Sequence, residues 1–132
     1  WGVTVIDDTY NASPASMAAA LRLMRTLRGQ RKIAVLGVML ELGNESEAAH
    51  REIGELAVES GASVLFCVGE RAAGIAEGAK AAGLSESAIV KVGASDEAAN
   101  ELKPLLKPGD VVLVKGSRMM KMELIVEALL SE

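Results

Sequence analysis

Three short segments of this chain place polar or charged side chains directly after an apolar run. They are residues 7–14 (DDTYNASP), 36–43 (LGVMLELG) and 114–118 (VKGSR). If the apolar runs are parallel strands, all three segments leave the same edge of one sheet, where α/β proteins bind their ligands. We therefore expect residues that are far apart in the sequence to form one site.

The first segment combines carboxylates, an aromatic ring and an amide. Asp7 and Asp8 supply hard oxygen acceptors for Mg²⁺ or for ribose hydroxyls; alternatively, one of them caps the turn and the other is solvated. Tyr10, one of three aromatic residues in the chain, could stack on a base, and Asn11 could hydrogen-bond to a base or a ribose. This segment predicts nucleotide binding.

The other two segments add charged groups. Lys115 and Arg118 flank a glycine and Ser117 just ahead of a predicted helix, an arrangement that suits a carboxylate or a phosphate. In the middle segment Glu41, together with Asn44 just beyond it, either shapes the same crevice or caps the following helix. We expect the capping role.

Short apolar runs alternate with segments of helical period along the whole chain. The predicted strands are residues 3–6, 32–36, 63–68, 88–92 and 110–114. Because these runs are continuously apolar, we expect parallel strands that are covered on both faces. The predicted fold class is α/β: a three-layer Rossmann-like domain over residues 1–132, with a mostly parallel sheet of about five or six strands flanked by helices.

Capping residues place the first helices between these strands. The first helix begins after Ser13 as its N-cap, with Pro14 in the first turn, and ends before Gly29. The second begins at a capping-box-like pattern in residues 44–47 and ends at Gly61.

The C-terminal half predicts three more helices. One covers residues 71–82, and another runs from a Ser95 cap to Pro104. The last presents an apolar stripe that we interpret as core rather than as a cofactor site. The stripe consists of Met119, Met122, Ile125, Val126 and Leu129.

Composition narrows the class of protein. The chain has 132 residues, 50% of them hydrophobic, which is enough for one core without a metal or a disulfide. Its net charge of −4 offers no basic field, so we expect no nucleic-acid partner. The apolar runs fall short of the roughly 20 residues that span a bilayer, so we expect no membrane insertion. We interpret Arg22, Arg25, Arg28 and Arg31 as a solvated face.

The single cysteine and the single histidine limit the chemistry that the chain can do. Cys67 is predicted to be a buried strand thiol, which excludes an internal disulfide and fits a reducing compartment. His50 is predicted on a helix surface or in a capping role, and sites that need several His or Cys ligands have no support. Neither GxGxxG nor GxxxxGK[ST] occurs. The start at Trp1, without a leader-like segment, suggests a domain cut from a longer chain.

Together these segments resemble the C-terminal domain of the Mur ligases. The matching features are DDTYNASPxSM, then VLGxMLELG followed by Ser46, Glu47 and His50, then VKGSR followed by Met122 and Glu123. The resemblance runs in one register from Val5 to Leu130. It is closest to the MurF type, which joins D-alanyl-D-alanine to UDP-N-acetylmuramoyl-tripeptide.

The resemblance implies an ATP-dependent ligase of bacterial peptidoglycan synthesis that works in the cytoplasm. ATP phosphorylates the carboxylate of UDP-N-acetylmuramoyl-tripeptide, and the amine of D-alanyl-D-alanine attacks the acyl phosphate. Such ligases have a UDP-sugar domain, a central ATPase domain and a C-terminal Rossmann-like domain, and this chain looks like the third only. The resemblance therefore implies that ATP and Mg²⁺ are bound mainly by the absent central domain. It also implies that this central domain is a partner, and that the chain alone has no catalytic residue, no metal site and no activity.

Site residues follow from the resemblance position by position. Asp8, Tyr10 and Asn11 match the family segment that meets the nucleotide, with Asp8 at the ribose hydroxyls and the other two at the adenosine end. Lys115 and Ser117 match the segment near the incoming amino component, where they would orient the carboxylate of D-alanyl-D-alanine. Arg118 is placed there as a helper.

Two positions depart from the family pattern. Val38 stands where the family usually has Asp, which removes a charge and bears on efficiency or substrate choice. Ser13 stands where Asn is common, and it remains a good N-cap.

Two other classes of protein stay open. A phosphoryl-receiver signalling domain also has an acidic pair after its first strand and a lysine after its fifth. It needs an aspartate after the third strand, where this chain has Cys67-Val68-Gly69-Glu70. The other alternative is a non-catalytic small-molecule-binding module, for which Val38 is the only indication.

Overall fold

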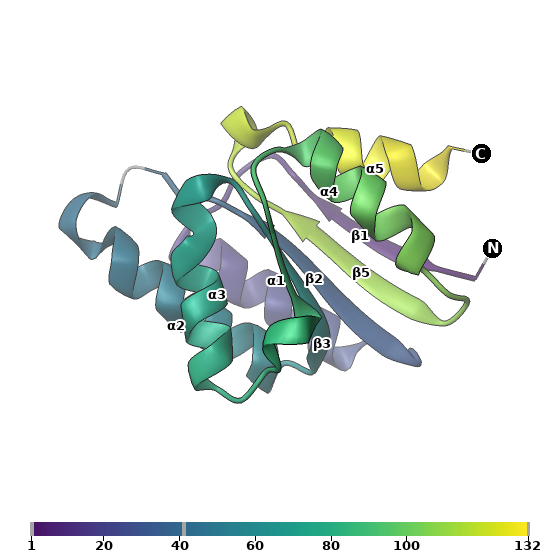
Figure 1. Cartoon of the computed structure of the whole chain (residues 1–132), viewed down its shortest axis with the longest axis horizontal. Helices are drawn as coiled ribbons and strands as arrows, with labels where there is room; N and C mark the ends of the chain where they lie inside the picture. The colour runs from purple at the N-terminus through teal and green to yellow at the C-terminus, as the bar shows by residue number, and fades with distance from the viewer. Residues whose placement is uncertain (1, 41, 132) are drawn as a thin grey trace.

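The computed structural model describes residues 2–40 and 42–131, in which five strands form one parallel sheet (Figure 1). The strands are β1 (Thr4–Asp8), β2 (Arg31–Gly37), β3 (Ala62–Val68), β4 (Ile89–Val92) and β5 (Asp110–Lys115). Their order across the sheet is β1-β5-β2-β3-β4, and each neighbouring pair is parallel. The predicted fold class and all five predicted strands are confirmed, with strand ends shifted by one or two residues.

Helices cover both faces of the sheet, as the predicted three layers require. The α-helices are α1 (Pro14–Thr26), α2 (Ser46–Glu59), α3 (Ala73–Ala81), α4 (Ser95–Leu102) and α5 (Glu123–Leu130). Helices α1, α2 and α3 lie on one face, and α4 and α5 lie on the other (Figure 1). After β4 the chain returns through α4 and inserts β5 between β1 and β2. The segments after β1 and β2 lead into α1 and α2 on one face of the sheet, whereas the segment after β5 leads into α5 on the other face.

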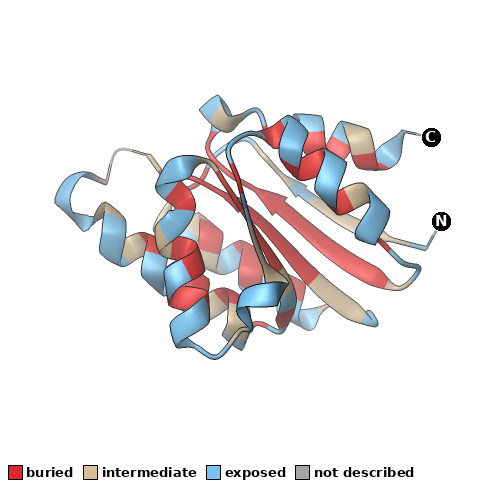
Figure 2. Ribbon diagram, in the orientation of Figure 1, coloured by how far each residue is buried: buried red, intermediate tan, exposed pale blue. Residues whose placement is uncertain are grey.

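Two apolar cores lie on the two faces of the sheet (Figure 2). Alternate residues of β2 supply both cores: Ala34 and Leu36 face the α1–α3 side, whereas Ile33 and Val35 face the α4–α5 side. This double burial explains why the strand sequences are continuously apolar. Cys67 is buried in β3, as predicted.

Helix α1 begins as predicted, whereas α2 and α4 begin without the side-chain caps predicted for them. Ser13 caps α1 through a reciprocal pair, because its Oγ accepts from the Ser16 N–H at 3.1 Å while its own N–H donates to Ser16 Oγ at 2.9 Å. The predicted box at residues 44–47 is wrong, since the chain enters α2 through the 3₁₀ turn η1 (Gly43–Glu45) without a side-chain cap. Ser95 is not a cap either: its hydroxyl donates to the Met120 carbonyl at 2.7 Å.

Two surface predictions also need correction. Met119 is exposed, because it lies in the 3₁₀ turn η5 (Arg118–Met120) ahead of α5 and not on the apolar stripe of that helix. Arg31 departs from the exposed arginines of α1: it opens β2 and pairs with buried Asp110 at 2.7 Å. None of the helices in the described ranges is long and apolar enough to cross a membrane.

Candidate functional site

The three segments singled out in the sequence meet at the carboxyl edge of the sheet. They follow β1, β5 and β2, which are adjacent in the strand order, and the register places both Asp8 and Leu36 beside Lys115. The Ser117 N–H also donates to the Val38 carbonyl at 3.3 Å, which joins the segment after β5 to the segment after β2. The three segments therefore lie together at this edge, as expected, and their role as one binding site stays a prediction.

Glycines allow the β2 and β5 segments to approach closely. A Cβ on Gly116 would lie 3.2 Å from the Gly37 Cα and 2.9 Å from the Met122 Cγ, and a Cβ on Gly37 would lie 3.3 Å from the Gly116 Cα. Only residues without a Cβ fit this crossing without displacing the backbone. Val38 is buried beside Gly69, so at this departure from the family pattern the chain contributes a backbone carbonyl and apolar packing.

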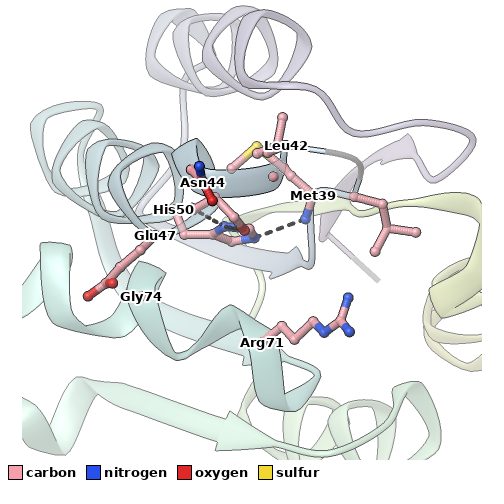
Figure 3. A pocket seen from close by; sticks show the side chains of 10 residues that line it. Met39, Leu42, Asn44, Glu47, His50, Arg71 and Gly74 are labelled. Atoms are coloured by element: carbon pink, nitrogen blue, oxygen red, sulfur yellow. Dashed lines mark hydrogen bonds between the residues drawn. The ribbon is translucent and has the colours of Figure 1, made fainter.

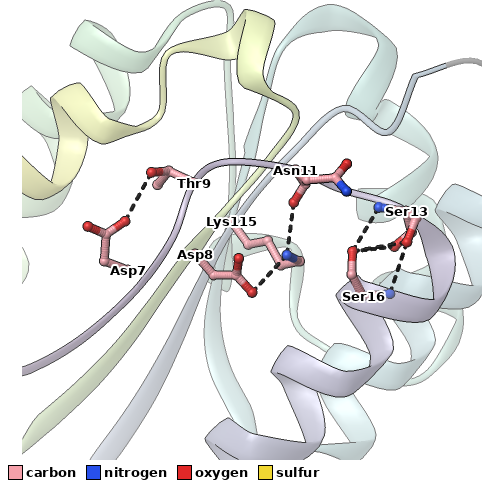
Figure 4. A network of polar contacts seen from close by, with 7 residues as sticks. All are labelled: Asp7, Asp8, Thr9, Asn11, Ser13, Ser16 and Lys115. Carbon is pink, nitrogen blue, oxygen red and sulfur yellow. Dashed lines mark hydrogen bonds and ion pairs between the residues drawn. The ribbon is translucent and has the colours of Figure 1, made fainter.

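A buried lysine joins the ends of β1 and β5 (Figure 4). The Lys115 side chain is 1% exposed, its Nζ lies 2.8 Å from Asp8 Oδ2, and it donates to the Asn11 carbonyl at 2.9 Å. Asp7 and Asp8 lie within β1 rather than beyond it. Asp7 is exposed and accepts a hydrogen bond from the Thr9 hydroxyl at 3.0 Å. The two adjacent carboxylates therefore have separate partners.

A small pocket opens among the three segments. Its volume is about 260 Å³, and it is lined by Tyr10, Asn11, Ala12, Leu40, Ser117, Arg118 and Met119. The Tyr10 ring is 72% exposed, and the Arg118 guanidinium carbon lies over it at 5.2 Å from the ring centroid. The Ser117 Oγ is buried and has no hydrogen-bond partner among the described residues. Of the predicted site residues, Tyr10, Asn11, Ser117 and Arg118 line this pocket, whereas Asp8 and Lys115 lie outside its lining.

The two middle-segment predictions have different outcomes. Glu41 lies outside the described residues. Asn44 makes no side-chain cap, and it lines a neighbouring cavity of about 650 Å³ between the segment after β2, the start of α2 and the start of α3 (Figure 3). Leu40 lines both this cavity and the small pocket.

His50 forms part of the wall of the larger cavity, and its predicted place on a helix surface is wrong. The residue is 1% exposed, and its Nε2 accepts a hydrogen bond from the Met39 N–H at 3.0 Å. Nδ1 therefore carries the ring proton and donates to the Ser46 carbonyl at 2.6 Å (Figure 3). The imidazole ties the segment after β2 to the first turn of α2, a role that the spacing of residues alone does not reveal.

A further hollow at the ends of β3 and β4 lacks reactive chemistry. It measures about 370 Å³ and includes Cys67 and Lys91 in its lining. Burial raises the pKa of the Cys67 thiol to about 12, against the opposing effect of the Lys91 charge. Cys67 is therefore protonated at neutral pH and is not a nucleophile.

Three residues of the small pocket lie outside the site predicted from the sequence. Ala12 and Leu40 belong to the three segments but have no predicted role, and Met119 is predicted to be core. Met119 follows directly on Arg118, and this position in the turn after β5 is the only sequence signal that could have placed it at the site.

Comparisons with known proteins identify the family that this chain resembles. Residues 1–118 match the family model described as "Mur ligase, glutamate ligase domain". The UDP-N-acetylmuramoyl-tripeptide–D-alanyl-D-alanine ligase of Mycobacterium tuberculosis is 39% identical over 99% of this chain and 29% of its own length. The Bacillus subtilis ligase of the same name is 38% identical over 98% of this chain and 28% of its own length.

Solved structures of MurF enzymes have the same fold over nearly all of this chain. MurF from Acinetobacter baumannii superposes with a TM-score of 0.83 at 32% identity, over 97% of this chain and 28% of that one. MurF from Thermotoga maritima in complex with ADP superposes with a TM-score of 0.79 at 31% identity, over the same shares of the two chains. The chain thus spans less than a third of the length of the relatives it matches.

Proposed function

The chain belongs to the Mur ligase family, and from this membership we propose that it is the C-terminal domain of an ATP-dependent ligase of the MurF type. The whole enzyme would join D-alanyl-D-alanine to UDP-N-acetylmuramoyl-tripeptide in the cytoplasm of a bacterium, as a step of peptidoglycan synthesis. The observation that carries this proposal is the pocket to which all three sequence segments contribute. The high similarity to proteins named for this reaction supports it.

The reaction divides into two steps, and this domain would serve both. In the first, the tripeptide carboxylate attacks the γ-phosphorus of ATP and ADP leaves. In the second, the amine of D-alanyl-D-alanine attacks the acyl carbon and phosphate leaves. Following the family resemblance, we assign Asp8, Tyr10 and Asn11 to the nucleotide, and Lys115, Ser117 and Arg118 to the dipeptide. Closure of this edge over the central domain would exclude water from the acyl phosphate.

The described residues of this domain do not fit a Mg²⁺ site. Within the described part of the chain no three His, Cys, Asp or Glu side chains are grouped as metal ligands would be. Asp8 is paired with Lys115, and Asp7 accepts from Thr9. We therefore assign Mg²⁺ and most of the ATP contacts to the central domain, which lies outside this chain.

Of the two alternative classes, the phosphoryl-receiver domain has evidence against it and the non-catalytic binding module does not. Family membership argues against a phosphoryl-receiver domain, and the end of β3 carries Cys67-Val68-Gly69-Glu70 without the aspartate that such a domain needs. A non-catalytic binding module would keep the same fold and is the alternative that an experiment must separate.

The test compares three polypeptides from the same gene: this chain, the portion that precedes it, and the two joined. We expect D-alanyl-D-alanine-dependent release of ADP from the joined polypeptide, in the presence of ATP, Mg²⁺ and UDP-N-acetylmuramoyl-tripeptide. Neither piece alone should release ADP. A joined polypeptide that folds but stays silent with every amino acid and dipeptide offered would favour the binding module.

A further inference from the structure

Lys115 at the end of β5 is buried, whereas Arg118 just after it is exposed, and this difference gives the two cations different roles. We propose that Arg118, with the Ser117 hydroxyl, receives the terminal carboxylate of the dipeptide, and that Lys115 is a positioning residue for the nucleotide segment. This inference rests on the proposed function. It replaces the role that the family resemblance implied for Lys115.

Lys115 has no free path to a ligand. Its side chain is 1% exposed, and its ammonium already contacts Asp8 Oδ2 at 2.8 Å and the Asn11 carbonyl at 2.9 Å (Figure 4). It does not line the pocket. To bind a carboxylate in the pocket it would have to break both contacts and leave its buried position, which is costly for a charged group.

The same two contacts fix the nucleotide segment. Asp8 ends β1, and the Asn11 carbonyl lies three residues further on, so one ammonium holds both ends of the turn that carries Tyr10. The Asp8 side chain remains 43% exposed, which leaves its other oxygen able to accept a hydrogen bond from a ribose hydroxyl. Lys115 thereby orients Tyr10 and Asp8 without touching the ligand.

Ser117 lacks a partner that a ligand would supply. The residue is 6% exposed, lines the pocket, and its Oγ has no hydrogen-bond partner among the described residues. Buried hydroxyls are almost always paired in folded proteins. A carboxylate oxygen in the pocket would accept a hydrogen bond from the Ser117 hydroxyl.

Arg118 is the cation that the pocket presents. Its side chain is exposed, it takes part in none of the ion pairs among the described residues, and its guanidinium lies over the Tyr10 ring. The cation–π contact holds the guanidinium beside the ring, and its N–H groups can donate two parallel hydrogen bonds to a carboxylate.

The experiment measures KM for ATP, for D-alanyl-D-alanine and for its C-terminal amide, in the full-length polypeptide. We expect wild type to prefer the acid over the amide, and Arg118→Ala to lose that preference through a rise of about tenfold or more in KM for the acid. Ser117→Ala should weaken the preference in part. Lys115→Met should keep it and raise KM for ATP instead. Arg22→Ala, an exposed arginine on α1, is the control and should behave as wild type.

Each other outcome has a defined meaning. If Lys115→Met abolishes the preference for the acid, or if Arg118→Ala raises only KM for ATP, the assignment is overturned; the second result would make Arg118 a phosphate contact. If Lys115→Met does not fold, Lys115→Gln, which keeps a hydrogen-bond donor for the Asp8 carboxylate and the Asn11 carbonyl, replaces it and should likewise raise KM for ATP while keeping the preference. A folded wild type that does not turn over with D-alanyl-D-alanine overturns the proposed function, and this inference with it.

Discussion

At the scale of single residues, the ion pair between Lys115 and Asp8 is asymmetric. The lysine is almost fully buried, whereas the aspartate side chain is 43% exposed. Water can solvate an aspartate that loses its partner, but it cannot reach the ammonium. Removal of the aspartate and removal of the lysine should therefore lower the free energy of unfolding by different amounts.

We predict that Asp8→Ala destabilises this chain more than Lys115→Met does. Loss of Asp8 leaves a buried ammonium with one carbonyl partner, at a cost of roughly 2–4 kcal/mol. Loss of the ammonium removes two hydrogen bonds from groups that water can reach, at a cost of about 1–2 kcal/mol. Urea unfolding measures both free energies. Asp7→Ala is the matched control and should change the free energy of unfolding by less than about 0.5 kcal/mol; equal costs for the two ends would contradict the prediction.

At the scale of elements, the segment after β2 depends on a histidine from the following helix. The Met39 N–H is buried and donates to His50 Nε2, and the ring is oriented by the Ser46 carbonyl in the first turn of α2. Leu40, the next residue, lines the small pocket. The His50 ring thus holds the first turn of α2 and the segment after β2 together.

We predict that His50→Ala destabilises the chain by about 1–3 kcal/mol, because the buried Met39 N–H loses its acceptor. Amide hydrogen exchange at Met39 and Leu40 should speed up, and urea unfolding should give the cost. Ser46→Ala is the control: it removes the hydroxyl but keeps the backbone carbonyl that holds Nδ1, so it should have a small effect. Unchanged exchange at Met39 in His50→Ala would show that another group supports this segment.

At the scale of the whole molecule, the two edges of the sheet have different roles. The carboxyl edge carries the candidate site, whereas at the amino edge Arg31, the first residue of β2, pairs with the buried Asp110, the first residue of β5. Arg31 donates to both Asp110 oxygens and to the Leu105 carbonyl. Burial by itself raises the pKa of Asp110, but hydrogen bonds from Arg31 and the Lys107 N–H, together with their charges, outweigh it and leave the pKa below its usual value.

This lowered pKa predicts acid sensitivity. The unfolded chain binds a proton at Asp110 more readily than the folded chain does, so the stabilisation is present above the unfolded pKa of about 3.9 and is lost as pH falls through the lower folded pKa. We expect Asp110→Asn to cost about 2–3 kcal/mol at pH 7, and this cost should shrink below about pH 4. Urea midpoints at pH 7, 5, 4 and 3 measure it.

The control for this measurement comes from an exposed ion pair. Glu77 pairs with Arg51 at 3.0 Å on the surface between α3 and α2, and both side chains are about half exposed. Glu77→Gln should follow wild type across the pH series, because exposed pairs contribute little. If the cost of Asp110→Asn does not fall with pH, the carboxylate charge does not supply the stabilisation.

The sequence by itself determined the layers of the fold and the edge of the sheet at which the three polar segments meet. Strand periodicity, the Ser13 cap and the polar residues after apolar runs are local signals, and local energetics decide all three features. The tertiary structure decided which strands are neighbours and which polar groups meet. Lys115 and Asn11 are 104 residues apart in the chain, and they meet only because β5 inserts between β1 and β2.

The same reason accounts for the residues that the sequence misplaced. His50, Ser95 and Arg31 each hold a group on another segment, so their local spacing resembles a surface or capping position. A helix period reports which side chains share a face, but burial and pairing depend on what packs against that face. Lys115 follows the same rule: its charge is visible in the sequence, while its role depends on a partner that only the folded sheet brings within 2.8 Å.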